Sequence, residues 1–150
     1  MPALDGKTAW ITGAGTGIGR AIALALAHAG ARVGLSGRSP DTLAETAAAI
    51  RAAGGTCTIA PCDVAQAEQV DTAWTSIVAE FGEIDILVNN AGWNLPRRAW
   101  KQLTPESVQQ MANVNLVGPF LCTLKVLPAM RIRRDGVVVN IASMAATGIH

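Results

Sequence analysis

The sequence contains no tyrosine, and aromatic residues of any kind make up 4% of its 150 residues. Charged residues are also sparse, at 15%, and twelve lysines and arginines against eleven acidic residues leave a formal net charge of +1. The largest basic group is Arg131, Arg133 and Arg134. Such a weak, balanced charge is not typical of proteins that bind nucleic acid or anionic membrane surfaces, and we expect neither as the main partner.

Histidine and cysteine are scarce as well. The two histidines and the three cysteines Cys57, Cys62 and Cys122 follow no metal-ligand spacing, so we expect no metal site and reduced thiols in or near the core. Arg, Asp, Gly or Asn interrupts each apolar run before the ~20 residues that span a bilayer, which predicts no transmembrane helix. Residues 1–6 lack the basic start and apolar middle of a secretory signal, so we expect a cytoplasmic protein.

Apolar residues, by contrast, make up 50% of the chain, enough to bury the core of one domain. Short apolar runs alternate with segments in which apolar residues recur every three or four positions, separated by glycine or proline. The pattern predicts strands at 8–12, 32–36, 56–60, 84–88 and 137–142. It predicts helices at 18–29, 40–53, 66–81 and 104–130, the last divided in two by Gly118, Pro119 and Pro128.

Continuous apolar strands joined by amphipathic helices are typical of a parallel sheet covered on both faces. We therefore predict a doubly wound α/β domain with strand order 3-2-1-4-5 and with its sites at the carboxyl ends of the strands. The predicted buried faces are Ile18, Ile22, Ala25 and Ala29 on the first helix and Val70, Trp74, Ile77 and Phe81 on the third.

A glycine-rich turn lies between the first strand and the first helix. It reads T-G-x-x-x-G-x-G from Thr12 to Gly19, a spacing that differs from the common dinucleotide fingerprint G-x-G-x-x-G. Glycines let the backbone approach a pyrophosphate, and the first turn of the helix offers free N–H groups and the positive end of its dipole. A tight turn alone would also favour glycine, but the flanking strand and helix favour phosphate binding.

The end of the second strand bears on the choice of cofactor. An acidic residue there typically accepts from the ribose 2′-hydroxyl of NAD, whereas an arginine suits the 2′-phosphate of NADP. Gly37 and Arg38 stand at this point, so NADP is favoured over NAD, although an arginine can equally be a solvated loop residue. Thr16 in the glycine turn adds no second positive charge.

Asp63 follows the third strand and has two interpretations that the sequence does not separate. Its carboxylate could accept a hydrogen bond from the exocyclic amine of adenine. It could equally be the N-cap of the helix that begins near Gln66.

Taken together, these motifs resemble the short-chain dehydrogenase/reductase family. The resemblance rests on Thr12 to Gly19, Asp63 with Val64, the run Asn89 to Gly92, Asn115, and the strand end Asn140 to Ser143. Each motif is weak or moderate alone, but they extend over all 150 residues in the family's order and spacing. The family fold is Rossmann-like, and the resemblance implies a single dinucleotide-binding domain.

The resemblance also implies roles for individual residues. The cofactor would be held by Gly13, Gly15, Thr16, Gly17, Ile18, Gly19, Arg38, Asp63, Val64, Asn90, Ala91 and Gly92. Asp63 and Val64 would hold adenine. Asn115 would support a water in the proton relay, and Ser143 would hydrogen-bond the substrate oxygen. From the residues alone, Asn115 reads as a polar residue inside a helix or a cap before Gly118, and Ser143 as a loop serine in the right place for a donor.

The sequence departs from the family at its chemical centre. The family uses a Tyr-x-x-x-Lys pair in the helix that follows the serine's strand. Here there is no tyrosine, and none of Lys7, Lys101 and Lys125 follows that strand. An apolar fifth strand without a neighbour would also be an aggregation liability. We therefore expect residues 1–150 to be part of a longer single-domain chain.

The leading hypothesis is an NAD(P)-dependent oxidoreductase that transfers hydride between nicotinamide C4 and a small-molecule carbonyl or secondary alcohol. Trp93, Asn94, Met144 and Ala145 could line the substrate pocket, although Trp93 and more so Trp100 could simply pack a loop. The alternatives are a non-catalytic dinucleotide-binding module or inactive truncated product, and, less well supported, a nucleotide-sugar epimerase. The resemblance further implies a homo-oligomer, dimer or tetramer, formed through the long helix before the fifth strand and through the family's helix after that strand.

Overall fold

A parallel sheet of five strands, in the order β3-β2-β1-β4-β5, forms the centre of the molecule. The computed structural model describes residues 2–95 and 99–143. The strands are β1 (Thr8–Thr12), β2 (Arg32–Ser36), β3 (Thr56–Ile59), β4 (Ile86–Asn89) and β5 (Val137–Asn140). Every pairing is parallel. The predicted doubly wound α/β fold and its strand order are therefore confirmed.

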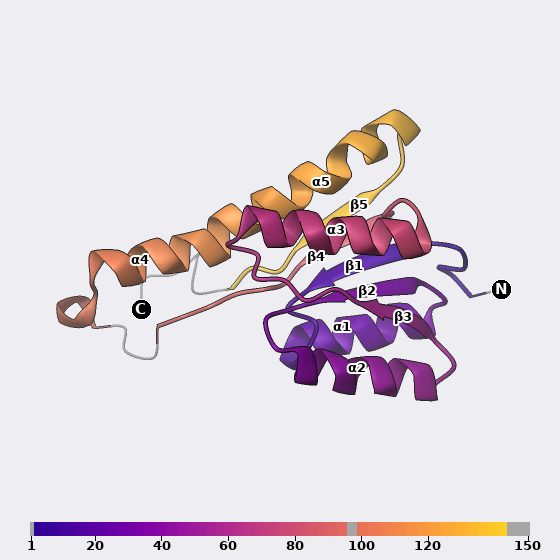
Figure 1. The fold of residues 1–150 in the computed structure, drawn as a ribbon, viewed down its shortest axis with the longest axis horizontal. Coiled ribbons are helices and arrows are strands. Elements are labelled where there is room, and N and C mark those ends of the chain that lie inside the picture. Colours follow the sequence, from indigo (N-terminus) through magenta and orange to yellow (C-terminus); the bar gives the residue numbers. More distant parts are fainter. Residues whose placement is uncertain (1, 96–98, 144–150) are drawn as a thin grey trace.

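Helices cover the two faces of the sheet, as Figure 1 shows. One face is covered by α1 (Gly17–His28) and α2 (Pro40–Ala52), and the other by α3 (Ala67–Phe81) and α5 (Gly118–Arg133). Before α5 come a 3-10 turn, η1 (Trp100–Gln102), the helix α4 (Pro105–Ala112) and a π-helical turn, η2 (Asn113–Val117). In Figure 1, α4 extends past the edge of the sheet.

Two apolar clusters, one on each face, form the core. The cluster under α1 and α2 is built on Ile11, Val33 and Leu35, which point to one side of adjacent strands. The cluster under α3 and α5 is built on Trp10 and Leu87, whose side chains point to the opposite face of the sheet. All three cysteines are buried and free, as predicted.

The face that α1 presents to the sheet differs from the prediction. Ile18 is 63% exposed, and Ala25 is exposed as well. The buried residues are instead Gly19, Ala23 and Ala27, spaced four apart. A stripe of glycine and alanine lets the helix axis approach the strands closely. The small residues therefore face the sheet, whereas the spacing of the larger apolar residues had predicted that Ile18 would face it.

The long helical region also corrects the prediction. It does contain two α-helices, but η2 joins them without a break, and Pro128 lies inside α5 rather than ending it. Proline removes one backbone donor from the helix, yet Val126 and Met130 on either side are buried against the sheet, and this packing keeps the segment helical. The last two strands are also shorter than predicted: β4 begins at Ile86 rather than Ile84 and extends to Asn89, and β5 ends at Asn140.

The continuous segment Pro105–Arg133 is long and apolar enough, by length and composition, to cross a membrane, with a mean hydropathy of 1.2 in its most apolar window. By length and composition alone, this segment therefore departs from the prediction of no transmembrane helix. Core helices of soluble proteins, which are mostly buried, pass the same test. Here 22% of the most apolar window is buried, and the segment contributes Val114, Cys122, Val126 and Met130 to the cluster under α3 and α5.

Candidate cofactor and catalytic site

Three of the glycines where the chain passes from β1 into the first turn of α1 are needed for different reasons. Gly13 and Gly17 have φ angles of +65° and +54°, in the left-handed region that side chains disfavour. Gly19 has an ordinary φ but no space, because a Cβ atom there would overlap the Gly13 carbonyl and the Asn90 side-chain amide. The turn therefore depends on glycine for both its path and its close contact with β4.

The N-terminus of α1 is open to an anion. Its N-cap, Thr16, makes no side-chain cap hydrogen bond, and the first turn has no acidic residue. By contrast, Ser39 and Thr104 cap α2 and α4, and Asp41 and Glu106 occupy their first turns. The first N–H groups of α1 are thus left to an external acceptor, which fits the pyrophosphate of a dinucleotide.

A crevice of about 450 Å³ runs past this helix end at the carboxyl edge of the sheet. Every residue predicted to bind the cofactor lines it, except Gly19: Gly13, Gly15, Thr16, Gly17, Ile18, Arg38, Asp63, Val64, Asn90, Ala91 and Gly92. Gly19 is buried behind the turn. The structure therefore brings together residues from four separate strand ends, and their shape and donor set fit a dinucleotide.

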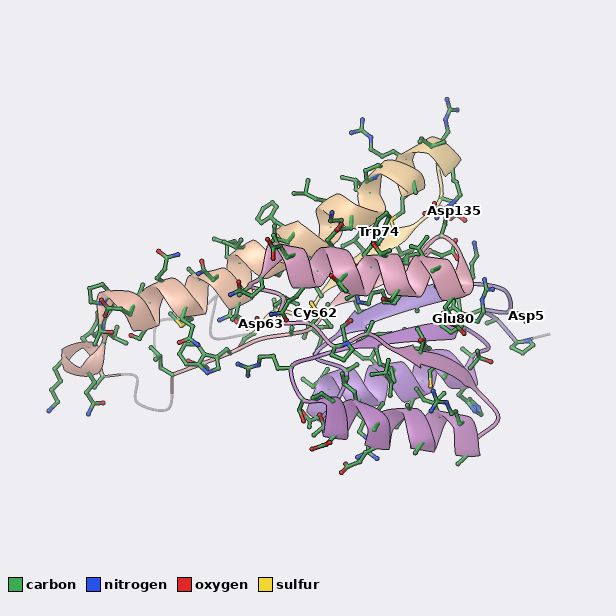
Figure 2. The ribbon with its side chains drawn as sticks, in the orientation of Figure 1. Asp5, Cys62, Asp63, Trp74, Glu80 and Asp135 are labelled. Atoms are coloured by element: carbon green, nitrogen blue, oxygen red, sulfur yellow. The ribbon has the colours of Figure 1, made fainter. Side chains whose placement is uncertain are left out.

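Asp63 lies where the chain leaves β3 for α3, next to Cys62 (Figure 2). Its Oδ1 accepts a hydrogen bond of 3.0 Å from the Ala65 backbone N–H. The N-cap of α3 is Gln66, so the interpretation of Asp63 as that cap is wrong. Asp63 closes the preceding turn and lines the crevice. Burial, reinforced by the Asp63 carboxylate, raises the pKa of the Cys62 thiol to about 11, so this thiol is protonated at neutral pH.

Thr12 and Asn90 join the ends of β1 and β4 under the crevice. The Thr12 hydroxyl accepts from the backbone N–H groups of Asn90 and Ala91, both at 3.0 Å, and donates to the Val88 carbonyl at 3.3 Å. The Asn90 side-chain amide donates to the Thr12 and Gly13 carbonyls at 3.0 and 3.2 Å. These bonds fix the glycine turn to the neighbouring strand.

A second cavity continues from the crevice, with which it shares Ile18 and the run Asn90 to Gly92. Its walls include Asn115 and Ser143, the two predicted catalytic residues, together with Trp93 and Asn94. The structure therefore places both predicted catalytic side chains beside the predicted cofactor path. Met144 and Ala145, also predicted to line a substrate pocket, lie outside the described residues.

Asn115 lies in the π-helical turn η2, and its side chain forms a two-sided contact with the β4–α4 loop. Its Oδ1 accepts from the Trp93 backbone N–H at 2.8 Å, and its Nδ2 donates to the Trp93 carbonyl at 2.7 Å. Single π-helical turns are frequent at functional sites. Asn115 is therefore a polar residue inside a helical segment, as one of the interpretations from the residues alone had it, and its side chain fixes the chain that forms one wall of the cavity.

Comparisons with known proteins agree with this geometry. A family model described as short chain dehydrogenase matches residues 7–149. The chain belongs to the short-chain dehydrogenase family. A metagenomic short-chain oxidoreductase solved in complex with NADP superposes with a TM-score of 0.93 at 34% identity, over 99% of this chain and 67% of that one.

Two curated relatives of this family member are reductases. A fatty acyl-CoA reductase from Acinetobacter baylyi is 37% identical over 142 residues, which cover 94% of this chain and 48% of the relative. A 3-oxoacyl-[acyl-carrier-protein] reductase from Synechocystis sp. is 38% identical over 146 residues, covering 97% and 59%. The chain thus spans about half the length of the curated relatives it matches.

The structure adds site residues that sequence reasoning missed in this family member. Ser39 and Thr42 at the start of α2 line the crevice beside Arg38. Asn89, 4% exposed, donates from Nδ2 to the Asn140 side chain at 2.9 Å, and Thr123 of α5 lies 3.3 Å from the same nitrogen. The i, i+3 spacing from Ser39 to Thr42 was a usable signal, whereas the Asn89 contacts join positions far apart in the sequence.

Two further observations on this family member concern metal ligands and tryptophans. Within residues 2–95 and 99–143, no group of three or more His, Cys, Asp or Glu side chains could hold a metal ion. Trp100 is 89% exposed, so the interpretation that it packs a loop is wrong, whereas Trp93 packs against the cluster under α3 and α5.

Proposed function

We propose that the chain binds NADP and forms the cofactor half of an oxidoreductase that transfers hydride between the nicotinamide ring and a small-molecule carbonyl or secondary alcohol. The observation that carries this proposal is the crevice at the carboxyl ends of the strands, where the uncapped end of α1 meets a cavity that contains Asn115 and Ser143. Parallel α/β sheets bind ligands at this position.

The choice of NADP rests on the end of β2. Arg38 lines the crevice, with Ser39 and the hydroxyl-bearing Thr42 beside it. Gly37 stands where an NAD-binding protein would place a carboxylate for the ribose hydroxyl. A guanidinium in this position offers a bidentate site for a 2′-phosphate. The relative that was solved with NADP supports the same choice.

In the proposed reaction, the bound cofactor supplies or accepts the hydride. The hydroxyl of Ser143 donates a hydrogen bond to the substrate oxygen, and Asn115 holds the cavity wall through its contacts with Trp93. Neither residue is an acid strong enough to deliver the proton that the substrate oxygen needs. None of the 150 residues is a tyrosine, so the proton donor used by the family is not among them.

The partners and location follow from the same proposal. A small-molecule carbonyl or alcohol is the substrate, with neither nucleic acid nor membrane as a partner, and the protein is cytoplasmic. We further propose a homo-oligomer, dimer or tetramer, for which the support is the apolar surface of α5 and the turn before it: Leu116, Phe120 and Leu124 are 59%, 64% and 63% exposed.

Titration with NADPH and NADH tests the cofactor part of the proposal. We expect saturable binding that favours NADPH by about tenfold or more, since the 2′-phosphate gains a charge-assisted contact. Arg38→Ala should remove this preference without abolishing NADH binding. Equal affinity of the unaltered protein for both dinucleotides would contradict the role of Arg38, and the absence of binding would contradict the proposal.

Oxidation of NADPH with a panel of aldehydes and ketones tests the chemical part, and it uses the protein at the length at which it is made, with its intact mass measured alongside. Ser143→Ala should lower kcat by about a hundredfold, as expected for one lost donor to a developing oxyanion, and leave the NADPH dissociation constant unchanged. The missing tyrosine favours a second candidate, a binding module without chemistry, which predicts saturable NADPH binding with no turnover.

A further inference from the structure

Thr46 is a polar side chain in the middle of α2 that is fully buried, with 0% exposure. Its Oγ1 lies 3.1 Å from the Thr42 carbonyl one turn earlier, a common contact for a threonine within a helix. The same atom also lies 3.1 Å from the Ala14 carbonyl and 3.3 Å from the Gly15 carbonyl. The hydroxyl has one hydrogen, so these three carbonyls share it as acceptors, and two of them belong to consecutive peptide groups of the glycine turn.

These contacts connect α2 to the part of the turn that faces the crevice. Gly15 lines the crevice together with Thr42 and Arg38, and Ala14 is fully buried behind it. Thr42 restricts Gly15 from the same side, because a Cβ atom on Gly15 would overlap the Thr42 hydroxyl. Two threonines on one face of α2 thus hold Gly15, Thr42 by direct contact and Thr46 by hydrogen bonding.

The direction of the two carbonyls matters because peptide groups are planar and trans. In each such group the C=O and the following N–H point in opposite directions. If the Ala14 and Gly15 carbonyls are turned toward Thr46, the N–H groups of Gly15 and Thr16 are turned away from it. Backbone N–H groups in this turn are the donors available to a phosphate at the end of α1.

We propose that Thr46 is a positioning residue for the dinucleotide, acting through the turn rather than by touching the cofactor. Its single hydroxyl hydrogen, shared between the Ala14 and Gly15 carbonyls, holds both carbonyls toward α2 and thereby directs the N–H groups of Gly15 and Thr16 away from it. The inference rests on the proposed NADP binding and identifies a residue outside the crevice lining that sets cofactor affinity.

Thr46→Val is the direct test, because valine has the shape of threonine without the hydroxyl. The measurement is the NADPH dissociation constant by fluorescence titration, on protein shown by circular dichroism to be folded at the assay temperature. We expect Thr46→Val to weaken binding about tenfold, which corresponds to about 1.4 kcal/mol. Thr46→Ser, which keeps the hydroxyl, should stay within about threefold of the unaltered protein.

Thr8→Val is the matched control for a merely structural effect. Thr8 is also fully buried and its hydroxyl also bonds a backbone carbonyl, that of Phe81 at 3.3 Å, but it lies at the opposite end of β1 from the crevice. Its loss should lower the melting temperature and leave NADPH affinity unchanged. If Thr46→Val lowers the melting temperature in the same way without a change in affinity, the proposal is overturned.

Amide hydrogen exchange, measured with and without NADPH, gives a second readout. Bound NADPH should protect the N–H groups of Gly15 and Thr16, and Thr46→Val should reduce this protection more than protection elsewhere in the chain; full protection of both groups in the variant would also overturn the proposal. If Thr46→Val does not fold, the pair Thr46→Ser and Thr46→Ala takes its place, since both lack the methyl group and only serine keeps the hydroxyl. Absence of NADPH binding by the unaltered protein would instead contradict the proposed function, whatever the exchange result.

Discussion

The strands β1 and β5 have similarly apolar sequences and lie in the same parallel sheet, yet their surroundings differ. All five residues of β1 are buried, whereas in β5 Val137 and Val139 are 52% and 39% exposed. β1 pairs with a strand on each side, and β5 pairs only with β4 among the described residues. An apolar run therefore predicts a strand, while its burial depends on which elements cover it.

Only one face of β5 is exposed. Val138 packs against the cluster under α3 and α5, while Val137, Val139 and Ile141 point to the face that α1 and α2 cover farther along the sheet. No described helix covers β5 on that face. Exposed apolar surface of this kind usually meets another protein surface.

The sharpest test of this contrast is a pair of truncations in one row of the sheet. Ile11 of β1 pairs with Val88, which pairs with Val139 of β5. Ile11 is 0% exposed, so Ile11→Ala should lower the free energy of unfolding by about 4 kcal/mol. Val139→Ala should lower it by about 0.5 kcal/mol, because its side chain already contacts solvent. Urea denaturation measures both, and similar losses would mean that β5 is as well covered as β1.

Substitutions of two glycines in the first turn of α1 should give the next largest effect. Gly19→Ala forces a methyl group onto the Gly13 backbone, so we expect a loss of about 3 kcal/mol and of NADPH binding. Gly17→Ala meets no atom within 4 Å but must adopt a φ of +54°, at a cost of about 1 kcal/mol. Denaturation and NADPH titration measure both variants. Equal losses would show that backbone conformation, rather than space, limits the turn.

Gly19 and Gly17, one limited by space and the other by backbone conformation, show which features of the fold could be predicted from the sequence and which could not. Apolar runs and glycine turns are local signals, and they predicted the strands, their order and the glycine turn, whereas much of the crevice lining, such as Val64 and Asn90 to Gly92, came from the resemblance to the short-chain dehydrogenase/reductase family. The buried face of α1 was wrong because periodicity ranks Ile18 above Gly19, whereas the sheet selects for small size. Contacts such as Asn115 with Trp93 or the hydrogen bond of 2.9 Å from Trp10 to Ser36 join distant positions, and no local pattern encodes them.

The thiols of Cys62 and Cys122 can report whether the α5 side of the sheet is as well shielded from solvent as its centre. Burial, with a smaller effect of Asp63, raises the pKa of Cys62 to about 11, and burial, with a smaller effect of Cys62, raises that of Cys122 to about 12, both from an ordinary 9.0. A raised pKa means that the folded state holds its proton more tightly. The stabilisation is therefore complete below pH 9 and is lost as the pH rises toward 11 or 12.

Denaturation at a series of pH values measures this loss. Between pH 9 and 11 the free energy of unfolding should fall by about 1 kcal/mol per pH unit for each thiol. The double variant Cys62→Ala, Cys122→Ala should have a flatter profile, and both thiols should react slowly with iodoacetamide at pH 8 because little thiolate is present. Rapid alkylation of the folded protein would show that the α5 side is open.

The smallest effect should come from the ion pair between Lys7 and Asp135, which joins the starts of β1 and β5. Lys7 Nζ lies 2.8 Å from Asp135 Oδ2, with both side chains largely exposed, and 3.7 Å from Asp85 Oδ1. The hydrogen bond to Lys7 lowers the pKa of Asp135, and the hydrogen bond to Asp135 raises the pKa of Lys7. Solvent and salt screen such pairs strongly.

The stabilisation by this ion pair should therefore be lost both at low pH and at high pH. It disappears as the pH falls below the ordinary aspartate pKa of 3.8 toward the lower value in the folded state, and as it rises past the ordinary lysine pKa of 10.5. At neutral pH, Asp135→Asn should change the melting temperature less than any variant above, and the change should shrink in 1 M salt. A large loss that salt does not alter would mean that the start of β5 is held to β1 by packing around Asp135, and that β5 is less of an open edge than its exposed valines indicate.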